Sequence, residues 1–471
     1  MNNTITGSYT DLYQLTMGQV YFLRGDKDAP ATFDYFFRKL PFSGGFAVFA
    51  GLETVMDILE DFRFDSKDLA FLKEQGFHPE FLDYLKDFEF RGSVYSALEG
   101  EVVFPTEPIL RVEASIIEAQ IVETMILNLL NFQTLVATKA ARMKIEAKDR
   151  KLVDFGLRRA QATGGHYASR AAVIGGFEGT SNVRAGRDFD IPVSGTMAHS
   201  FIQSYGDELE AFRDFAAYHP TNTVLLVDTY DTLRSGVPNA IQVGLEMKAK
   251  GQSLNGIRLD SGDLAYLSKR ARKMLDDAGL HEVEISVSNQ LDEHLIKSLL
   301  EQEAPIDVFG VGTRLVTGNP DAALDGVYKL SYFKGKPSLK ISETIAKVTL
   351  PHRKQVLRTY DEHGHFAGSD VVCLVDEQDP EMMYHPFDPI KSRSVKGVAK
   401  EALLKPVMKN GKRMFPAKSL EEIKKFSEER LELLPGEYKR FFNPHLYKVG
   451  LSEELKNQRD QLLKEHKKSK A

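Results

Sequence analysis

Polar residues follow seven short apolar runs between residues 150 and 315, at the point where each run ends. The runs are 152–153, 176–178, 191–193, 224–227, 256–259, 285–287 and 308–311. The residues that come after them, or close them, supply carboxylates, hydroxyls, a guanidinium and paired glycines: Asp154, Ser181, Thr196, Asp228, Arg258, Asp260, Ser288, Gly310 and Gly312. Because the carboxyl ends of parallel strands meet on one face, this pattern predicts one polar rim. Such a rim is where an active site forms.

Arginines and glycines on this rim indicate an anionic ligand. Arg158, Arg258 and Arg314 carry guanidinium groups, which bind phosphate or carboxylate in a two-pronged fashion. Structural ion pairs with Asp154, Asp228 and Asp260 are the alternative, and the residues alone leave both open. Residues 310–313 place two glycines and Thr313 after an apolar run, so backbone N–H groups can approach a phosphate.

Common catalytic and nucleotide-binding motifs are missing from the chain. No Walker or dinucleotide-binding fingerprint follows a predicted strand, so any ATP is held in another way. There is no HExxH motif and no GxSxG elbow. Cys373 is the single cysteine, which excludes an intramolecular disulfide and a multi-cysteine metal site. His199 stands on the rim, but a lone histidine is more often structural than catalytic.

The elements that must position these residues alternate regularly. The starts of three runs, at residues 224, 256 and 285, are separated by about the length of one strand–helix unit. Helical patterns lie between the runs, over 207–218, 240–250, 264–278 and 293–301. The sequence therefore predicts a parallel (β/α) barrel over residues 126–345, and both an incomplete and an eight-unit barrel stay open.

Two further segments flank the predicted barrel. Residues 1–125 combine a strand pattern at 32–38, helices at 52–62 and 79–88, and strands at 99–105 and 109–114, which predicts an α+β domain. Residues 119–148 form one long helix or two in tandem. Residues 346–471 form a helical and strand extension that packs on the N-terminal domain and the barrel, with a strand at 347–358 and helices at 419–434 and 452–467.

The overall charge excludes one large class of function. The 471 residues include 61 Lys and Arg against 67 Asp and Glu, a net charge of -6, which argues against a general nucleic-acid binder. No segment approaches the roughly 18 apolar residues of a membrane span, and no secretory signal is visible at the start. With a single cysteine, we expect a cytoplasmic protein.

Seven motifs in order resemble nicotinate phosphoribosyltransferases: residues 10–17, 33–38, 154–159, 179–182, 195–199, 258–263 and 310–313. No single motif is specific, whereas the ordered set is. The resemblance runs from the N-terminus to about Arg358 and is looser over 345–471. Pro351 is followed by His352 where many relatives carry Pro-Gly, a departure confined to a turn.

The resemblance implies an irregular barrel of the type II phosphoribosyltransferase kind and a defined reaction. Nicotinate and phosphoribosyl pyrophosphate give nicotinate mononucleotide and pyrophosphate, coupled to ATP hydrolysis, as the first step of NAD salvage from nicotinate. It implies that His199 is transiently phosphorylated and that Arg258 and Asp260 act in catalysis. It implies ATP and Mg²⁺ as cofactors, with Mg²⁺ carried on substrate phosphates and touched by Asp228 or Asp260.

The resemblance also assigns the substrate contacts. Tyr13 and Phe155 sandwich the nicotinate ring, whose carboxylate meets Arg258, Thr196 and Ser181. The relative that uses nicotinamide carries an aspartate where Ser181 stands, so Ser181 favours the acid. The residues expected to bind phosphoribosyl pyrophosphate are Arg38, Arg158, Ser288, Gly310, Gly312 and Thr313. Because Tyr13 and Arg38 lie far from the rim in sequence, the N-terminal domain must fold over the rim for both to reach one site. The resemblance implies that a second subunit contributes part of the pocket, so we expect a homodimer with shared active sites.

Three alternatives remain at the level of sequence. The first is a nicotinamide phosphoribosyltransferase of the same architecture. The second is the barrel enzyme that uses and decarboxylates quinolinate, which should need more basic residues and a shorter chain. The third is a non-catalytic barrel that binds a metabolite.

Overall fold

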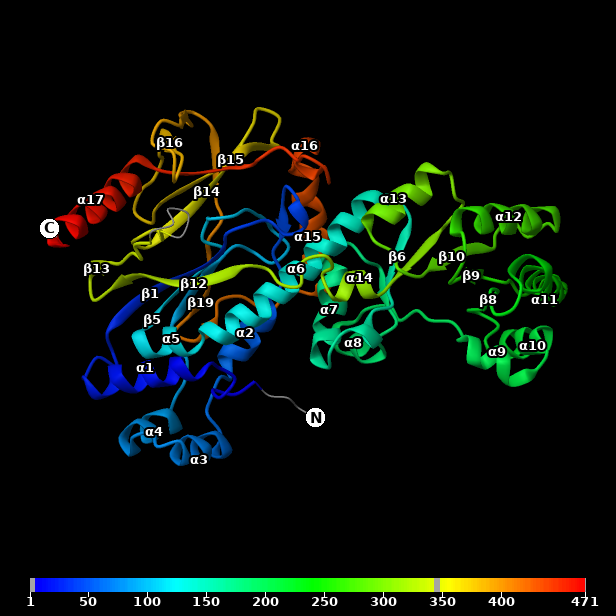
Figure 1. Cartoon of the computed structure of the whole chain (residues 1–471), viewed down its shortest axis with the longest axis horizontal. Coiled ribbons are helices and arrows are strands. Elements are labelled where there is room, and N and C mark those ends of the chain that lie inside the picture. The colour runs from blue at the N-terminus through cyan, green and yellow to red at the C-terminus, as the bar shows by residue number, and fades with distance from the viewer. Residues whose placement is uncertain (1–4, 343–347, 471) are drawn as a thin grey trace. The chain divides into compact units, whose positions relative to one another are not determined.

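The computed structural model describes residues 5–342 and 348–470, which form two compact units (Figure 1). Unit 1 combines the chain up to Leu135 with the chain from Ala323 onward, and unit 2 is Val136–Ala322. The predicted division into 1–125, 126–345 and 346–471 describes order along the chain and stays a prediction. Each unit has its own sheet and is described separately.

Unit 2 contains the parallel sheet that the alternating pattern predicts. Its strands run in the order β7-β6-β11-β10-β9-β8, and every adjacent pair is parallel. The strands are β6 (Lys151–Asp154), β7 (Gly179–Thr180), β8 (Val224–Leu226), β9 (Gly256–Leu259), β10 (Glu284–Ser288) and β11 (Val308–Val311). A single parallel bridge joins Thr180 to Val193 beside β7. The predicted irregular barrel is confirmed, with six strands and one bridge in place of seven strands.

Two of the predicted strands are shorter than, or shifted from, their apolar runs. Residues 176–178 precede β7 because Gly176 has a φ of 101° and turns the chain at the end of the preceding helix. Residues 191–193 contribute only the one-residue bridge at Val193. The apolar runs predicted the approximate positions of both segments. They did not predict the strand lengths, because apolar content does not determine how many hydrogen bonds a segment makes with its neighbours.

Helices follow most of these strands, and acidic caps fix several of their starts. The side chains of Asp207, Asp263 and Asp292 accept hydrogen bonds from first-turn N–H groups of α10, α12 and α13. The helices of unit 2 are α7 (Thr163–Ile174), α8 (Val183–Phe189), α9 (His199–Tyr205), α10 (Glu208–Tyr218), α11 (Val237–Ala249), α12 (Leu264–Asp277), α13 (Glu293–Glu301) and α14 (Thr313–Val316). A 3₁₀ turn, η2 (Leu157–Arg159), and a π-helical turn, η3 (Thr232–Gly236), complete it. The predicted helices at 207–218, 240–250, 264–278 and 293–301 are confirmed.

Unit 1 is built on two sheets. The first has the order β13-β12-β1-β5-β3-β19-β20, with antiparallel neighbours. Its strands are β1 (Pro30–Phe37), β3 (Ser93–Ser96), β5 (Leu110–Ser115), β12 (Gly326–Phe333), β13 (Lys336–Pro337), β19 (Lys405–Lys409) and β20 (Lys412–Arg413), and a separate pair joins β2 (Ala47–Val48) to β4 (Val102–Val103). The α+β character predicted for the N-terminal residues is confirmed, although β12 and β19 arrive from far along the chain.

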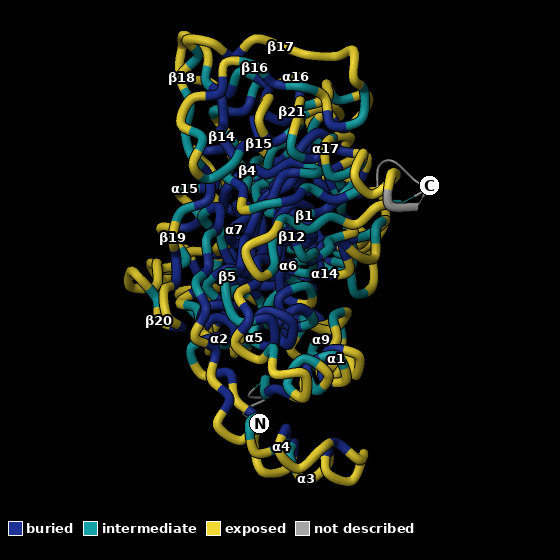
Figure 2. The backbone as a smooth tube through the Cα atoms, turned by 90° about the vertical axis from the view of Figure 1, so that its left-hand side faces the viewer, coloured by how far each residue is buried: buried dark blue, intermediate teal, exposed yellow. Residues whose placement is uncertain are grey.

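The helices of unit 1 differ in burial, as Figure 2 shows: α3 and α4 are largely exposed, whereas the strands form the buried interior. Those from the N-terminal part of the chain are α1 (Leu12–Leu23), α2 (Leu52–Glu60), α3 (Ser66–Glu74), α4 (Pro79–Lys86), α5 (Ile116–Ile121) and α6 (Glu123–Ala147), with a 3₁₀ turn η1 (Pro41–Ser43). The pattern at 119–148 is resolved as two helices in tandem, and α6 continues into unit 2.

The second sheet of unit 1 comes entirely from the C-terminal part of the chain. Its order is β17-β16-β21-β15-β14-β18. The strands are β14 (Lys354–Tyr360), β15 (Phe366–Leu374), β16 (Met382–Tyr384), β17 (Ser392–Ser394), β18 (Ala399–Ala402) and β21 (Lys448–Leu451), accompanied by α15 (Leu420–Leu433), α16 (Gly436–Lys439) and α17 (Glu453–Lys470). The strand predicted at 347–358 begins only at Lys354, and Lys347 lies outside the described residues. Both predicted helices are confirmed.

A buried charged cluster lies against this second sheet. The Arg358 side chain is 0% exposed, and its guanidinium lies 2.6 Å from Glu101 Oε1 and 2.7 Å from Asp370 Oδ2. Arg430 also pairs with Glu101, at 2.8 Å. We call Arg358, Glu101, Asp370, Arg430 and Glu107 the buried cluster. Because β14, β15, α15 and the loop around β4 each contribute to it, the cluster joins segments far apart in sequence.

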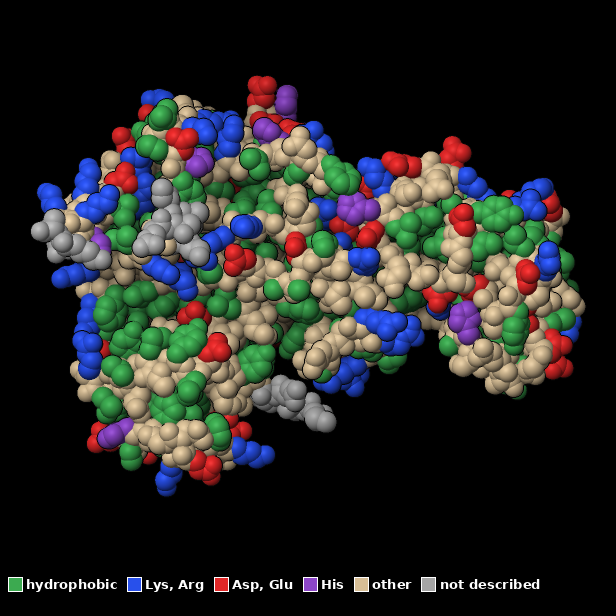
Figure 3. Space-filling model, in the orientation of Figure 1, with side chains coloured by type: hydrophobic (Ala, Val, Ile, Leu, Met, Phe, Trp, Pro, Cys, Tyr) green, Lys and Arg blue, Asp and Glu red, His purple; other side chains and the backbone are tan. Residues whose placement is uncertain are grey.

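The outside of unit 1 is charged where its last helix lies. Figure 3 shows Lys and Arg side chains gathered at the end of the unit that carries α17. Leu455 of this helix is fully buried, so the helix presents its apolar side inward. No helix among the described residues is long and apolar enough to cross a membrane.

Candidate functional site

Arg258 is the centre of the polar rim in unit 2. Its Nε donates to Ser288 Oγ at 3.0 Å, and its Nη1 donates to Thr196 Oγ1 at 3.0 Å. The guanidinium also lies 3.3 Å from Asp260 Oδ2 and 5.5 Å from the centre of the Phe155 ring. The ends of three strands and one loop therefore converge on one cation. Since the Arg258 side chain is only 14% exposed, its charge is partly shielded from water.

A cavity of about 310 Å³ opens beside Arg258. It is lined by Phe155, Leu157, Arg158, Ser181, Gly195, Thr196, Met197, Ala198 and Arg258. The four barrel residues predicted to contact nicotinate, together with Arg158, thus lie around one hollow. An aromatic ring, two hydroxyls and two guanidiniums form a surface suited to a flat anion. We call this hollow the ring cavity.

Asp154 holds the two loops that carry Phe155 and Ser181. Its carboxylate accepts hydrogen bonds from Gly156 N at 2.7 Å, Ser169 Oγ at 2.7 Å and Thr180 Oγ1 at 2.8 Å. Its backbone oxygen accepts from Ser181 N at 2.8 Å. Burial raises the pKa of the Asp154 carboxyl, and the donated hydrogen bonds oppose that rise. Asp154 is therefore fully occupied in positioning the cavity walls and does not pair with an arginine.

Gly310 makes room for the Phe155 ring. A Cβ at this position would lie 2.4 Å from Phe155 Cε2, a distance that no side chain tolerates. Glycine here lets the aromatic ring lie flat against β11. The sequence had suggested only a phosphate-binding use for this residue, so the packing against Phe155 is an additional reason for glycine.

His199 and Asp228 form a second part of the rim. His199 begins α9, its side chain is 40% exposed, and its Nδ1 lies 3.0 Å from Thr229 Oγ1. Its Nε2 lies 3.9 Å from Asp228 Oδ1, an oxygen that is buried and has no hydrogen-bond partner. The imidazole therefore has one hydrogen-bond contact through Nδ1, faces a carboxylate at longer range through Nε2, and is partly open to solvent.

The carboxylates of the rim are largely engaged by neighbouring groups. Asp228 Oδ2 accepts from Asp260 N at 2.9 Å and from Ser261 Oγ at 2.6 Å. Asp260 Oδ1 accepts from Ser288 Oγ, and Asp260 Oδ2 faces Arg258. Asp228 Oδ1 is thus the carboxylate oxygen of this pair that is left for a cation. Among the residues that the structure describes, no group of three or more His, Cys, Asp or Glu could hold a metal by itself.

A second cavity of about 540 Å³ follows the strands through the interior of the barrel. Phe155, Thr196, Arg258 and Gly310 line its part near the carboxyl ends of the strands. Lys151, Asn255, Glu282 and Glu284 line its part near their amino ends. Sequence reasoning did not predict this lumen, because the size of a barrel interior depends on strand tilt and side-chain packing.

The last rim residues lie on the loop after β11. Gly312 precedes Thr313, the first residue of the short helix α14. A Cβ on Gly312 would lie 3.3 Å from Phe155 O, so the two loops approach closely. Gly312, Thr313 and His199 are not among the residues lining the ring cavity. The Arg314 guanidinium donates a hydrogen bond to the side-chain oxygen of Asn319, and not to the carboxylates of the rim.

Tyr13 and Arg38 belong to unit 1. Tyr13 lies on α1 and is 49% exposed, together with the exposed apolar side chains of Leu12, Val20 and Leu23. Arg38 follows β1, and its Nε is buried without a hydrogen-bond partner. Burial lowers the pKa of the Lys329 ammonium, and the nearby charges of Arg38 and Lys340 lower it further. Lys329 lies on β12 opposite Asp34 of β1 and 4.0 Å from Glu123, and sequence reasoning did not identify it.

Three sequence models of one family match the chain. The nicotinate phosphoribosyltransferase N-terminal domain matches residues 9–131, the nicotinate phosphoribosyltransferase family matches 150–367, and the C-terminal domain of the same enzymes matches 353–459. Together they cover most of the chain.

Individual relatives agree. Nicotinate phosphoribosyltransferase of Bacillus subtilis is 46% identical over 98% of this chain and 95% of its own length. The Dictyostelium discoideum enzyme of the same name is 38% identical over 97% of this chain and 88% of its own. The crystal structure of human nicotinic acid phosphoribosyltransferase aligns with a TM-score of 0.87 at 31% identity, covering 96% of this chain and 99% of that one.

The fold extends to a related activity. The crystal structure of nicotinate-nucleotide pyrophosphorylase from Pyrococcus furiosus aligns with a TM-score of 0.72 at 26% identity, over 91% of this chain and 95% of that one. The family model and the two relatives with higher sequence identity are all named nicotinate phosphoribosyltransferase. The chain belongs to the nicotinate phosphoribosyltransferase family.

Proposed function

We propose that this enzyme transfers the phosphoribosyl group from phosphoribosyl pyrophosphate to nicotinate, with ATP hydrolysis coupled to the transfer through a phosphohistidine at His199. The products are nicotinate mononucleotide, pyrophosphate, ADP and phosphate, and the reaction opens NAD salvage from nicotinate in the cytoplasm. The observation that supports this most strongly is the ring cavity, where Phe155, Ser181, Thr196 and Arg258 surround one space of about 310 Å³.

Nicotinate binds in the ring cavity. Its flat ring stacks on Phe155, and its carboxylate takes hydrogen bonds from Arg258, Thr196 and Ser181. Ser181 is uncharged and can donate, so it accepts the acid, whereas a carboxylate at that position would repel it. Because Ser288 and Thr196 accept hydrogen bonds from Arg258, the guanidinium is held in place before the substrate arrives.

Phosphoribosyl pyrophosphate binds across the rim. Arg158, Ser288, the Gly310 and Gly312 backbone and Thr313 hold its phosphates, and Arg38 of the second subunit adds a cation. As pyrophosphate leaves, positive charge develops at the ribose carbon and the pyridine nitrogen attacks it. Asp260 stabilises that charge, and the cations stabilise the leaving group.

His199 couples ATP to this transfer. A neutral imidazole nitrogen attacks the γ-phosphate, the bond to ADP breaks, and phosphohistidine forms and is later hydrolysed. The contacts with Thr229 and Asp228 orient the ring for in-line attack. Asp228 Oδ1 lies near Nε2, where a carboxylate stabilises the positive imidazolium that the reaction produces.

Magnesium fits this rim as an ion carried by substrate phosphates. The described carboxylates form no cage of three or more ligands, and Asp228 Oδ1 is the unpartnered oxygen facing the rim. Bound there, Mg²⁺ neutralises phosphate charge. The residues of this chain meanwhile orient the imidazole and hold the ring.

Tyr13 and Arg38 complete the site from a second subunit. Tyr13 closes the ring cavity against Phe155, as a sandwich of two aromatic rings. Exposed Leu12, Val20 and Leu23 on the same helix supply apolar surface for contact between subunits. We therefore propose a homodimer with shared active sites, measurable as a twofold mass by light scattering.

A product assay tests the proposed function. The chain is incubated with phosphoribosyl pyrophosphate and Mg²⁺, with and without ATP, and with nicotinate or nicotinamide. We expect nicotinate mononucleotide and ATP-stimulated turnover. Preference for nicotinamide would instead support the amide-using alternative, and ligand binding without turnover would support the non-catalytic one.

A further inference from the structure

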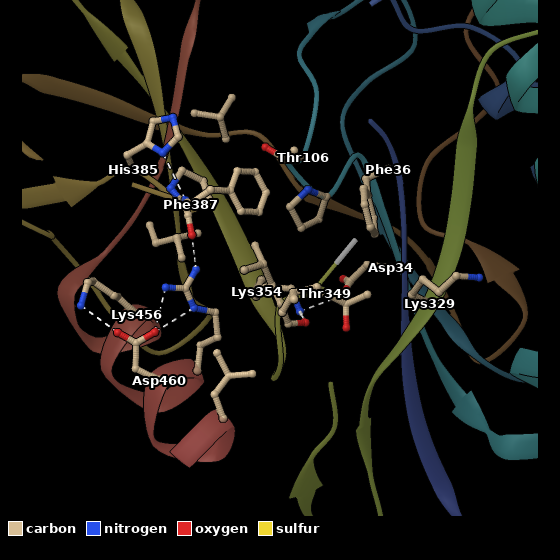
Figure 4. A pocket seen from close by; sticks show the side chains of 18 of the residues that line it. Asp34, Phe36, Thr106, Lys329, Thr349, Lys354, His385, Phe387, Lys456 and Asp460 are labelled. Atoms are coloured by element: carbon tan, nitrogen blue, oxygen red, sulfur yellow. Dashed lines mark hydrogen bonds and ion pairs between the residues drawn. The ribbon is translucent and has the colours of Figure 1, made fainter. Parts of the chain in front are cut away.

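Unit 1 contains a cavity of about 220 Å³ that the proposed transfer reaction does not use (Figure 4). It lies where the first sheet, the second sheet and α17 meet. Phe36 and Pro108 form one apolar wall, and Phe387, Val449 and Leu463 form the other. An engineered cavity of about 150 Å³ in another protein is large enough for benzene. The volume here therefore suits one aromatic ring with a small substituent.

One buried polar atom of this cavity has no partner. Asp34 lines the cavity, its side chain is 4% exposed, and its Oδ2 lies 2.8 Å from Lys354 Nζ. Its Oδ1 is buried and accepts no hydrogen bond. A buried acceptor without a donor is unfavourable, so a ligand that donates to Asp34 Oδ1 would complete this end of the cavity.

The same end of the cavity offers a donor beside this acceptor. Thr349 Oγ1 accepts from Lys340 N at 2.8 Å, which leaves the hydroxyl hydrogen to donate. Figure 4 shows Asp34, Thr349 and Lys354 next to one another. A primary carboxamide on an aromatic ring presents an N–H donor and a C=O acceptor side by side, which matches this pair.

The cations around the cavity are already neutralised. Lys354 Nζ donates to the backbone oxygens of Leu350 at 3.0 Å and Pro351 at 3.0 Å, besides pairing with Asp34. Arg459 and Lys456 both pair with Asp460, at 2.8 Å each. Lys329, which also lines the cavity, donates to Tyr328 O at 2.8 Å and lies 4.0 Å from Glu123. Each of these cations is thus engaged by protein oxygens, whereas a carboxylate ligand would meet the negative charge of Asp34.

We propose that this cavity is a binding site for a neutral aromatic carboxamide, with the amide on Asp34 and Thr349 and the ring between Phe36 and Phe387. The selectivity is the reverse of that proposed for the ring cavity, which takes the acid. The site would let the amide of a pyridine carboxylic acid bind the enzyme without occupying the site of transfer.

The test uses benzamide and benzoate, titrated into the full chain without ATP or phosphoribosyl pyrophosphate. We expect benzamide to bind and benzoate to bind at least about tenfold more weakly, the size of one lost charge-assisted or buried hydrogen bond. Leu463→Trp should fill the space and weaken benzamide by about tenfold or more. Leu462→Trp, on the neighbouring position of α17 that does not line the cavity, is the matched control.

A further variant separates the two sites. Phe155→Ala removes the aromatic wall of the ring cavity and should leave benzamide binding unchanged. Asp34→Asn keeps the shape but turns an N–H group toward the ligand, and it should reduce the preference for benzamide over benzoate. Equal binding of amide and acid, binding unaffected by Leu463→Trp, binding lost in Phe155→Ala, or no binding at all would overturn the proposal. None of these outcomes depends on turnover, so a failed transferase assay would be a separate result.

Discussion

Two arginine-centred groups in this molecule use the same chemistry for different ends. In the buried cluster, Arg358 is 0% exposed and pairs with Glu101 and Asp370. On the rim, Arg258 is 14% exposed, faces a cavity and is flanked by Ser288, Thr196 and Asp260. The difference lies in exposure: the rim keeps an open cavity and a partly exposed imidazole, whereas the arginines of the buried cluster are paired with carboxylates and shielded from water.

Charged residues in the buried cluster and on the rim contribute to different properties of the protein. A buried ion pair cannot be broken on one side without leaving an uncompensated charge, so its residues govern stability. A partly open guanidinium and imidazole can exchange water for a substrate, so their residues govern turnover. Variants in one region should therefore change stability without changing activity, and variants in the other should do the reverse.

The largest effect is expected from His199→Ala. If His199 carries the phosphoryl group, the variant loses ATP hydrolysis and all labelling from γ-³²P-ATP, and keeps only a slow, ATP-independent transfer. Its unfolding temperature should remain that of the wild type, because the side chain is 40% exposed and makes one hydrogen bond to Thr229. Labelling that persists in the variant would remove His199 from the mechanism.

Arg358→Met should give the opposite pattern. It removes the buried cation that pairs with Asp370 and one of the two arginines that pair with Glu101, which costs about 3–5 kcal/mol of unfolding free energy. Transfer activity per folded molecule should stay close to the wild-type value. Urea unfolding and initial rates on the same preparation measure both. An unfolding free energy equal to that of the wild type would show that the buried cluster does not stabilise the second sheet.

Ser181→Asp should act on one substrate more than the other. A carboxylate beside the ring cavity repels nicotinate, and we expect its KM to rise by about 10–100-fold, corresponding to roughly 1.5–3 kcal/mol for an interaction with a charged group. The KM for phosphoribosyl pyrophosphate should change much less. Ser181→Ala is the matched control, because it removes the hydroxyl without adding charge. An equal rise in both KM values would indicate general damage to the barrel.

The smallest effect concerns Glu107 and pH. Burial and the nearby Asp370 raise the pKa of the Glu107 carboxyl well above its ordinary value of 4.5. The folded protein therefore holds this proton more tightly than the unfolded chain. Its stability contribution is present below pH 4.5 and is lost as the pH rises through the folded pKa, at up to about 1.4 kcal/mol per pH unit.

Glu107→Gln should remove that dependence. The variant should gain stability relative to the wild type between pH 5 and pH 8, as measured by urea unfolding at both values, since glutamine does not titrate. The exposed Glu465→Gln on α17 is the control and should change nothing. A wild type and Glu107→Gln whose stability difference is the same at both pH values would contradict the raised pKa.

Much of unit 2 was predictable because its signals are local. Alternating apolar runs and helical patterns indicated strands and helices close to their observed bounds, and the structure shows Asp207, Asp263 and Asp292 capping three of those helices. The ring-cavity residues Phe155, Ser181, Thr196 and Arg258 were also predictable, since parallel strands end on one face. Their assignment to nicotinate came from the resemblance of the motifs, not from spacing.

What could not be predicted depends on pairings between distant segments. Lys329 lies opposite Asp34 because β12 pairs with β1 across nearly three hundred residues. The buried cluster likewise joins Glu101 to Arg358 and Arg430. His352 adopts a φ of 69°, a backbone conformation that glycine adopts without strain, which explains why glycine is expected at this turn. The sequence alone shows the histidine only as a substitution, and the structure shows that its backbone is strained.

The most direct test of the account is a crystal structure of the chain soaked with nicotinate and phosphoribosyl pyrophosphate. We expect the pyridine ring on Phe155, with its carboxylate within hydrogen-bond distance of Arg258 and Ser181 and its nitrogen facing the ribose. Electron density for nicotinate anywhere other than this cavity, or a carboxylate turned away from Arg258, would contradict the assignment of the rim as the site of transfer.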